Sequence, residues 1–375
     1  MKIYYWCPYL TNIATINAVK RSAISVKKYS NKKPDVSILN SSGEWLFFKN
    51  NSFGIKILST LKNVNLHKYL PKQGLFFSRI SFLIIFIINL FPLIYKIKKN
   101  KPNYLIIHLL TFLPIILSPL LSKDTKIILR ISGYPEMTIF RKLLWKYFSK
   151  YLYAITAPTK LTMDYLIENK IFERNKIKVL KDPIIDVNEI NKKKKLNENI
   201  KIKEEFYVAI GRLTGQKNFE FLIDSFSKNI NKFKIKKLYI VGDGENFNKL
   251  KKKLMNNKME NNIFLTGFKK NVYEIINDSS GLISVASYED PGFTLIEAAF
   301  LRKKIISSLV KNGPLEMNNF GNTGYFFEFN NEEDFIKKIL ESENSNNFNK
   351  LKNALKFSKE YSKFHHFQEL DKILI

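Results

Sequence analysis

The chain has 375 residues, of which 45% are hydrophobic and 25% are charged. This length exceeds what one ordinary core supports, so we expect two domains, and the composition excludes a disordered chain, a collagen and a disulfide-stapled miniprotein. The single cysteine, Cys7, cannot form an internal disulfide, and the first ten residues lack the apolar run and cleavage site of a secretory signal. We therefore expect a protein of the reducing cytoplasm.

The net charge of +29 belongs mainly to the first part of the chain. Residues 1–150 contain 24 Lys and Arg against 4 Asp and Glu, a surplus of 20, whereas residues 201–375 contain 28 against 22, a surplus of 6. Only 7 of the 62 cations are Arg, the side chain that binds phosphate and guanine with two hydrogen bonds, so we expect no nucleic-acid partner. Compositional bias toward Lys and Asn would explain the total, but it does not explain this asymmetry.

In chain order, the amino-terminal part alternates short apolar runs with helical spacing. The predicted strands cover residues 2–6, 36–39, 104–108 and 126–131, and residues 13–29 are predicted to form a helix. Such alternation is typical of a parallel, doubly wound sheet.

The most apolar stretch of the chain, Ile80–Tyr95, lies in this basic part, between Arg79 and Lys96. Its 16 residues, which include Ser81, Asn89 and Pro92, fall short of the ~20 needed to cross a bilayer as a helix. We expect the stretch to dock on an anionic membrane surface. The alternative is a buried helix of an α/β domain, and the two hold together if one helix face packs inward and the other meets lipid.

A polar, lysine-rich run divides the chain. We predict an amino-terminal domain over 1–185, a linker over 186–204, a carboxyl-terminal domain over 205–350 and a last helical segment over 351–375 that returns to the first domain. In the second domain, strands are predicted at 206–210, 238–241, 263–266, 281–286 and 305–308, and helices at 219–230, 272–276 and 293–301. The fold class is therefore α/β, with two Rossmann-like doubly wound domains and a ligand cleft at the ends of their strands.

The loop Gly211–Asn218, GRLTGQKN, follows a predicted strand and opens a helix. Its two glycines free backbone amides, and Arg212 and Lys217 add two cations, so the loop could bind a diphosphate. It is neither a Walker loop nor a dinucleotide-binding GxGxxG. The alternative is two solvated cations on an ordinary surface loop.

Two carboxylates, Glu289 and Glu297, lie eight residues apart in EDPGFTLIE. We expect Glu289 on the loop after a strand and Glu297 in the first turn of a helix, because Pro291 and Gly292 delay the helix start. The amides of that helix start suit a phosphate group. As an alternative, Thr294 and Glu297 match a capping box that closes the helix end.

These segments together resemble the donor-binding domain of the family 4 retaining glycosyltransferases of the GT-B architecture. The resemblance is carried, in order, by GRLTGQKNFEFLIDSF, LYIVGDGE, IFLTGF and ASYEDPGFTLIEAAF. It covers residues 205–330 well and the amino-terminal domain loosely. It departs from the family at TNIATINAVK, where a glycine pair is usual, and at LRKK, where glycine and proline are usual.

The resemblance implies a role for each matching residue. Arg212 and Lys217 would hold the donor diphosphate, Glu297 the ribose hydroxyls, and Glu289 would face the transferred sugar. His108 would lie near that sugar, although a lone histidine after an apolar strand is more often structural. The remaining donor-binding positions are Gly211, Gly242, Gly267, Gly292, Phe293, Thr294 and Leu295.

We accordingly predict a retaining hexosyltransferase that uses a UDP-sugar in preference to a GDP-sugar and needs no cofactor. No Asp-x-Asp pair and no His or Cys cluster suggests a metal, so the cations and helix amides would stabilise the leaving group. We expect a lipid-linked saccharide acceptor, a role in O-antigen or capsule polysaccharide, and a peripheral position on the cytoplasmic face of the membrane. The alternatives are a nucleotide-sugar epimerase of the same fold and a basic membrane- or nucleic-acid-binding protein on a non-catalytic scaffold.

Overall fold

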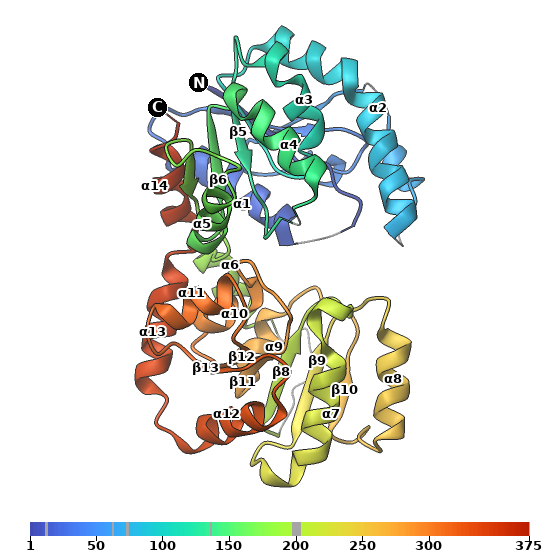
Figure 1. Cartoon of the computed structure of the whole chain (residues 1–375), viewed down its shortest axis with the longest axis vertical. Coiled ribbons are helices and arrows are strands. Elements are labelled where there is room, and N and C mark those ends of the chain that lie inside the picture. Colours follow the sequence, from blue (N-terminus) through green and yellow to red (C-terminus); the bar gives the residue numbers. More distant parts are fainter. Residues whose placement is uncertain (12–13, 62–63, 73–74, 136, 197–203, 375) are drawn as a thin grey trace. The chain divides into compact units, whose positions relative to one another are not determined.

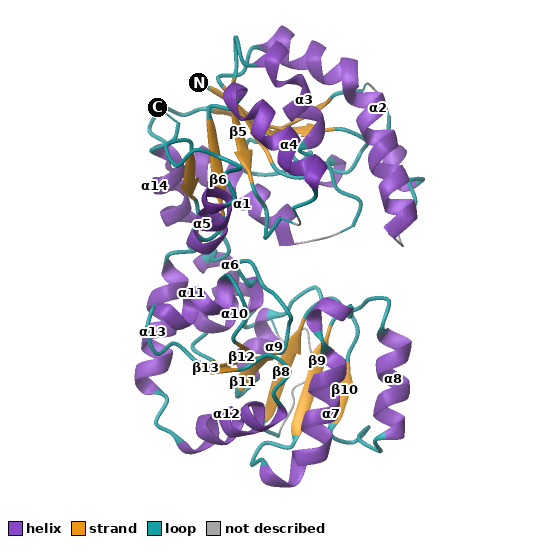
Figure 2. Ribbon diagram, viewed as in Figure 1, coloured by secondary structure: helices purple, strands orange, loops and turns teal. Residues whose placement is uncertain are grey.

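The computed structural model describes residues 1–374 except 12–13, 62–63, 73–74, 136 and 197–203 (Figure 1). The chain divides into two compact units. The amino-terminal unit comprises Met1–Pro183 and Lys363–Ile375, and the carboxyl-terminal unit comprises Ile184–Ser362. Both contain strands flanked by helices, as Figure 2 shows.

The sheet of the amino-terminal unit is parallel throughout and has the order β3-β2-β1-β4-β5-β6-β7. Its strands are β1 (Lys2–Trp6), β2 (Asp35–Asn40), β3 (Lys56–Ser59), β4 (Tyr104–Ile107), β5 (Lys126–Arg130), β6 (Ala154–Ala157) and β7 (Ile177–Val179). The strand order reverses between β1 and β4, and open α/β sheets bind ligands beyond the strand ends at such a switch point.

Helices cover both faces of this sheet, as two buried apolar clusters show. One face carries α1 (Ala14–Tyr29) and α14 (Lys363–Asp371). The other carries α2 (Leu75–Asn100), α3 (Phe112–Leu121), α4 (Ile139–Phe148) and α5 (Lys160–Glu168). Because both faces are covered, the strands are almost continuously apolar, as in the YLII of β4.

The carboxyl-terminal unit repeats this plan with a parallel sheet of order β10-β9-β8-β11-β12-β13. Its strands are β8 (Phe206–Ile210), β9 (Lys237–Val241), β10 (Ile263–Leu265), β11 (Gly281–Ser284), β12 (Lys304–Ser308) and β13 (Tyr325–Phe327). Its helices are α6 (Val187–Lys193), α7 (Phe219–Asn229), α8 (Phe247–Asn256), α9 (Tyr273–Asp278), α10 (Phe293–Phe300), α11 (Gly313–Asn319), α12 (Glu332–Asn344) and α13 (Phe348–Lys359). The order reverses between β8 and β11, which places the loops after these strands at the switch point.

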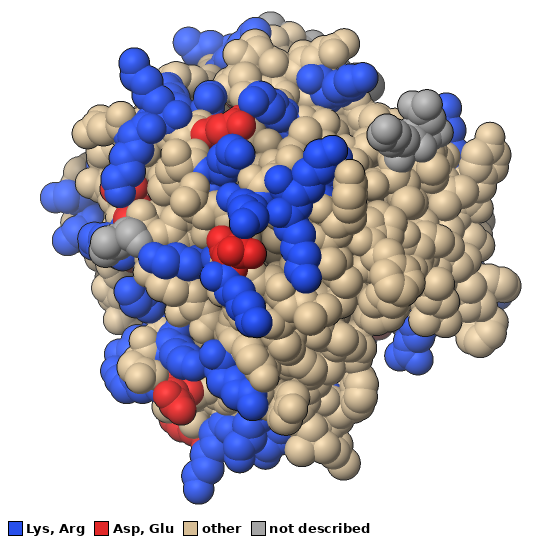
Figure 3. Space-filling view, turned by 90° about the horizontal axis from the view of Figure 1, so that it is seen from above, with Lys and Arg blue, Asp and Glu red and all other residues tan. Residues whose placement is uncertain are grey.

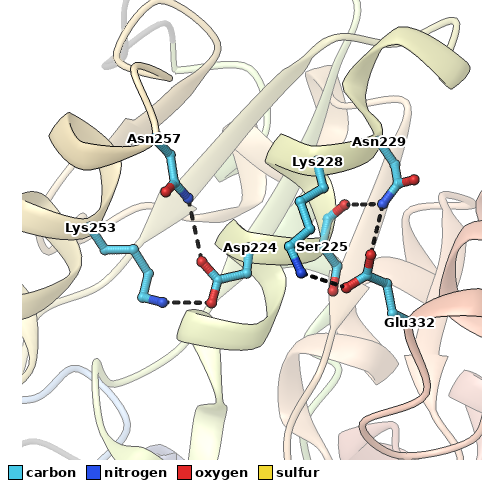
Figure 4. A network of polar contacts seen from close by, with 7 residues as sticks. All are labelled: Asp224, Ser225, Lys228, Asn229, Lys253, Asn257 and Glu332. Atoms are coloured by element: carbon cyan, nitrogen blue, oxygen red, sulfur yellow. Dashed lines mark hydrogen bonds and ion pairs between the residues drawn. The ribbon is translucent and has the colours of Figure 1, made fainter.

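Polar contacts fix α7 to its neighbours on one face of this sheet (Figure 4). Asp224 accepts hydrogen bonds from Lys253 at 2.5 Å and from Asn257 at 3.4 Å, which joins α7 to α8. Asn229 donates to Glu332 at 3.1 Å, which joins α7 to the start of α12. The helix that follows the Gly211–Asn218 loop is therefore held on two sides.

The two-unit parallel α/β architecture that the sequence predicts is confirmed. The boundaries that the structure gives differ in two places. Within the predicted linker 186–204, α6 belongs to the carboxyl-terminal unit because Ile190 is buried in its core, while 197–203 lie outside the described residues. Near the end of the chain, α13 also belongs to that unit, and the chain enters the amino-terminal unit only at Lys363.

Helix α2 is longer than the sequence suggested. The prediction of a run too short to cross a bilayer is wrong, because Phe76–Asn100 is long and apolar enough for that by length and composition. Pro92 lies inside the helix rather than ending it. One side of α2 packs inward, with Ser81, Asn89 and Leu93 buried, so the alternative of a helix packed into an α/β domain is confirmed for that side.

Candidate active site

The loops after β8 and β11 carry the predicted diphosphate residues. Gly211 follows β8, and its amide donates to the carbonyl of Val241 at 3.0 Å. Arg212 is exposed, and no other described residue forms a hydrogen bond or ion pair with its guanidinium. Its donors are therefore available to an anion from outside the chain.

Lys217 and Glu289 form an ion pair across these two loops. Their side chains are only 16% and 10% exposed, so the pair is largely shielded from water. Gln216 joins the same loops, since its side chain donates to the carbonyl of Tyr288 at 3.0 Å and its carbonyl accepts from Ser287 at 2.9 Å. An ammonium has three donors, so Lys217 can hold Glu289 and a phosphate oxygen at once.

Glycines let the neighbouring loops approach closely. A Cβ at Gly242, which has φ of 151°, would lie 1.8 Å from the carbonyl oxygen of Gly211. The amide of Gly242 donates to the carbonyl of Gly267 at 3.0 Å. Three strand-end loops, after β8, β9 and β10, are thereby packed backbone against backbone, and only glycine fits at position 242.

Helix α10 begins beside these loops, and its start corrects two expectations. Gly292, with φ of 88°, is the residue before the first turn, and no side chain caps the helix. The capping-box alternative is therefore wrong, because Thr294 lies inside the helix. Glu297 consequently falls in the second turn rather than the first. The first amides of α10, those of Phe293, Thr294 and Leu295, have no acceptor within the helix and suit an anion.

Glu297 is held by a residue that the sequence analysis missed. The hydroxyl of Tyr273, on α9, donates to Oε1 of Glu297 at 3.0 Å, and both side chains are buried. The sequence offered no spacing signal for this contact, because the two residues belong to different helices. The amide of Gly313 donates to the carbonyl of Glu289 at 2.9 Å, which fixes the backbone of that loop.

His108 belongs to the amino-terminal unit, where it follows β4 at the switch point beside β1. Its amide donates to the carbonyl of Trp6 at 2.9 Å. Its ring stacks on that of Tyr5, with 6.1 Å between the ring centroids. Burial, together with the positive charge of Arg130 and the nearby His366, holds the pKa of His108 well below its usual range. The imidazole is therefore neutral at pH 7, and its buried Nε2 has no partner among the described residues.

Metal ligands do not gather in the part of the chain that the structure describes. No group of three or more His, Cys, Asp or Glu side chains there could hold a metal ion. The predicted donor positions of the carboxyl-terminal unit lie on the loops after β8, β9, β10 and β11 and on the start of α10, whereas His108 lies on the other unit.

A family model described as "Glycosyl transferases group 1" matches residues 164–360, which include all the predicted donor positions. An uncharacterized glycosyltransferase of Methanocaldococcus jannaschii, MJ1059, is 32% identical over 246 residues, which cover 59% of each chain. An N-acetylgalactosamine-N,N'-diacetylbacillosaminyl-diphospho-undecaprenol 4-alpha-N-acetylgalactosaminyltransferase of Campylobacter jejuni is 22% identical over 65% of this chain and 66% of its own. The chain thus spans about three fifths of the length of these relatives.

A solved structure matches the whole chain. The structure of Anabaena Alr3699/HepE in complex with UDP aligns with a TM-score of 0.76 and 12% identity, covering 100% of this chain and 99% of the other. At this identity the likeness shows the fold alone, and that fold is GT-B, as the sequence predicts.

Proposed function

Because this chain belongs to the group 1 glycosyl transferases, we propose that it transfers a sugar from a nucleotide diphosphate donor to a saccharide acceptor and retains the anomeric configuration. The single observation that carries this proposal is the Lys217–Glu289 ion pair at the switch point of the carboxyl-terminal sheet. It brings a cation that can neutralise a leaving diphosphate next to a carboxylate that can contact the sugar.

The chemistry follows from charge. In the reaction, the bond between the sugar C1 and the β-phosphate oxygen breaks, and negative charge develops on the diphosphate. Arg212, Lys217 and the first amides of α10 would stabilise that charge. The departing phosphate oxygen takes the proton of the acceptor hydroxyl, which forms the new bond on the same face of the sugar.

The donor nucleoside would bind beside the glycine loops. Glu297 would accept hydrogen bonds from the ribose hydroxyls, and Tyr273 would keep its carboxylate in place. We propose UDP as the nucleotide. Anabaena Alr3699/HepE, a protein with this fold, was crystallised in complex with UDP, which supports that choice.

For the acceptor, we propose a lipid-linked saccharide of a cell-surface glycan. The name of the Campylobacter relative places diphospho-undecaprenol on its acceptor, which supports this class. A lipid-linked acceptor would require the protein to work at the cytoplasmic face of the membrane, as a peripheral protein.

Binding of UDP and GDP, measured by titration calorimetry with and without a chelator, tests the proposal. We expect UDP to bind more tightly than GDP, without need of a divalent metal, and we expect Arg212→Ala to weaken UDP binding. Lys251→Ala, an exposed lysine of α8, is the matched control. If neither UDP nor GDP binds, or if UDP binds equally to the wild type and to Arg212→Ala, the assignment of this site is overturned.

A further inference from the structure

Helix α2 buries the polar side chains of its apolar part and exposes apolar ones. The polar side chains in its apolar part face the protein: Ser81 donates to the carbonyl of Pro71 at 2.7 Å, and Asn89 donates to the carbonyls of Ile85 at 2.8 Å and Ser41 at 3.3 Å. Both side chains are fully buried. The helix therefore presents apolar residues outward as well as inward, unlike a helix that meets water on its outer side.

The outer side of α2 is a continuous apolar stripe with helical spacing. Its members are between 37% and 76% exposed: Phe76, Ile80, Leu83, Ile87, Phe91 and Tyr95. Soluble proteins rarely expose contiguous apolar area of this extent without a partner.

The stripe has a neighbour on α4. The ring of Phe112 on α3 contacts that of Phe86 on α2 and that of Phe140 on α4, with ring centroids 6.0 Å and 5.2 Å apart. The three helices therefore lie side by side. Four further exposed apolar side chains lie on α4: Ile139, Phe140, Leu143 and Tyr147. Three exposed lysines lie among or just after them: Lys142 in the first turn of α4, Lys146 in its last turn and Lys150 just beyond its end. We call these outer faces of α2 and α4 the apolar-basic surface.

Cations flank the stripe at both ends. Arg79 is exposed in the first turns of α2, and Lys98 and Lys99 are exposed in its last turn. Figure 3 shows Lys and Arg crowded on one part of the displayed face with few acidic side chains, and a broad uncharged area on another part of it. Apolar side chains beside lysines are the combination that anionic lipid headgroups bind.

We propose that the apolar-basic surface docks on an anionic lipid bilayer, with α2 lying along the headgroup boundary. A second copy of this chain is disfavoured as the partner, because residues 1–150 carry a surplus of 20 positive charges, which would repel one another across a symmetric contact. Insertion of α2 across the bilayer is also disfavoured. Insertion would remove Leu93 and Ile97 from the core and break the hydrogen bond that Asn89 donates to the carbonyl of Ser41.

Sedimentation of the full chain with vesicles tests this proposal. We expect binding to phosphatidylglycerol vesicles and much weaker binding to phosphatidylcholine vesicles. High salt should release the protein, because the screening length falls from about 10 Å at 0.1 M to about 3 Å at 1 M. Binding that persists in high salt and alkaline carbonate would instead show a spanning helix and would overturn the docking geometry.

Two pairs of matched variants locate the surface. Phe91→Asp should lower the vesicle partition coefficient at least about tenfold, from the loss of one buried aromatic side chain. Phe348→Asp, an equally exposed phenylalanine on α13, should not lower it. Lys98→Glu with Lys99→Glu should lower it at least about 30-fold, at about 1 kcal/mol for each lysine lost, because the new carboxylates also repel the anionic lipid. Lys251→Glu with Lys252→Glu, an exposed adjacent pair on α8, should change it little.

Other partners would give different results. Equal loss in all four variants, or no binding to anionic vesicles at low salt, would overturn the proposal. A dimer in light scattering without lipid that Phe91→Asp converts to a monomer would assign the surface to a second copy instead. UDP binding by each variant is measured in parallel, so loss of docking is distinguishable from failure of the proposed function.

Discussion

The two units share a fold but use charge in opposite ways. Residues 201–375 hold 22 acidic against 28 basic residues. In the carboxyl-terminal unit, ion pairs join helices or, as with Lys217 and Glu289, lie in the candidate active site. In residues 1–150, 4 acidic residues cannot pair with 24 cations. Opposite charges therefore pair within the carboxyl-terminal unit, whereas the amino-terminal part carries many more cations than its acidic residues can neutralise.

The largest expected effect concerns the cations of the carboxyl-terminal unit. Arg212→Ala and Lys217→Ala should each lower turnover about 100-fold, because removing one group that stabilises developing charge costs about 3 kcal/mol. Initial rates with a UDP-sugar and a lipid-linked acceptor measure this. Lys228→Ala, which removes a lysine paired with Glu332 away from the loops, is the control and should retain its rate. Unchanged rates in both site variants would contradict the proposed role of Arg212 and Lys217 in stabilising the leaving diphosphate.

A second effect tests the close packing of the loops after β8 and β9, where Gly242 lies against Gly211. Gly242→Ala should destabilise the unit by about 2 to 3 kcal/mol, since its Cβ would lie 1.8 Å from the carbonyl oxygen of Gly211. Gly215→Ala is the matched control, because a Cβ there meets nothing within 4 Å. Urea unfolding followed by circular dichroism gives both values. Equal stability of the two variants would contradict the close packing of these loops.

The sequence predicted the carboxyl-terminal unit more completely than the amino-terminal one. Gly211–Asn218 and Glu289 follow strands whose apolar runs are easily recognised, and parallel strands bring their carboxyl ends to one edge of a sheet, so their proximity could be inferred. The contact of Tyr273 with Glu297 could not, because it depends on how α9 packs against α10. Gly292 rather than Thr294 precedes α10 because a left-handed backbone conformation, which the residue letters do not reveal, ends the preceding loop.

The short strands β3, β6 and β7 of the amino-terminal unit were missed, as was β13 of the other unit, because runs of three or four residues give only a weak periodic signal. The apolar run of α2 was recognised in the sequence, but the sequence did not show which side of the helix faces water. Ser81 and Asn89 lie eight residues apart, just over two helical turns, and so fall on one face. That spacing was visible in the sequence, but only the packing against Pro71 and Ser41 shows that this polar face points inward.

A third effect, on stability against pH, belongs to the amino-terminal unit. Burial lowers the pKa of His366 to about 3. An unfolded histidine titrates near 6.5, so as the pH falls from 7 to 5 the unfolded chain gains a proton that the folded chain does not bind. The free energy of unfolding should fall by about 2 kcal/mol over this range from His366, and burial of His108 acts in the same direction.

Tryptophan fluorescence measures this effect selectively, because Trp6, Trp45 and Trp145, the three tryptophans of the chain, all belong to the amino-terminal unit. Urea unfolding at the two pH values should show a smaller pH dependence in His366→Gln than in the wild type. His365→Gln, at the partly exposed adjacent position, is the control. A wild-type stability that does not change between these pH values would contradict neutral burial of these histidines.

The smallest expected effect separates ligand positioning from packing within the carboxyl-terminal unit. Tyr273→Phe removes the hydroxyl that donates to Glu297, and Tyr325→Phe removes one that donates to Asn347 at 2.8 Å, away from the donor loops. Each should cost about 1 kcal/mol of stability, as one hydrogen bond does. Only Tyr273→Phe should also raise the KM for the donor, several-fold, with kcat nearly unchanged, because Glu297 would bind ribose in substrate and transition state alike.

The ratio of the affinities for UDP and 2′-deoxy-UDP distinguishes the two roles of Tyr273, because a tyrosine with a purely structural role would not affect this ratio. If Tyr273 orients Glu297 toward the ribose hydroxyls, the wild type should prefer UDP, and Tyr273→Phe should lose part of that preference while Tyr325→Phe keeps it. An unchanged preference in Tyr273→Phe would mean that the buried hydrogen bond only packs α9 against α10. Glu297 would then be a structural residue of this unit, and ribose recognition would have to come from the glycine loops.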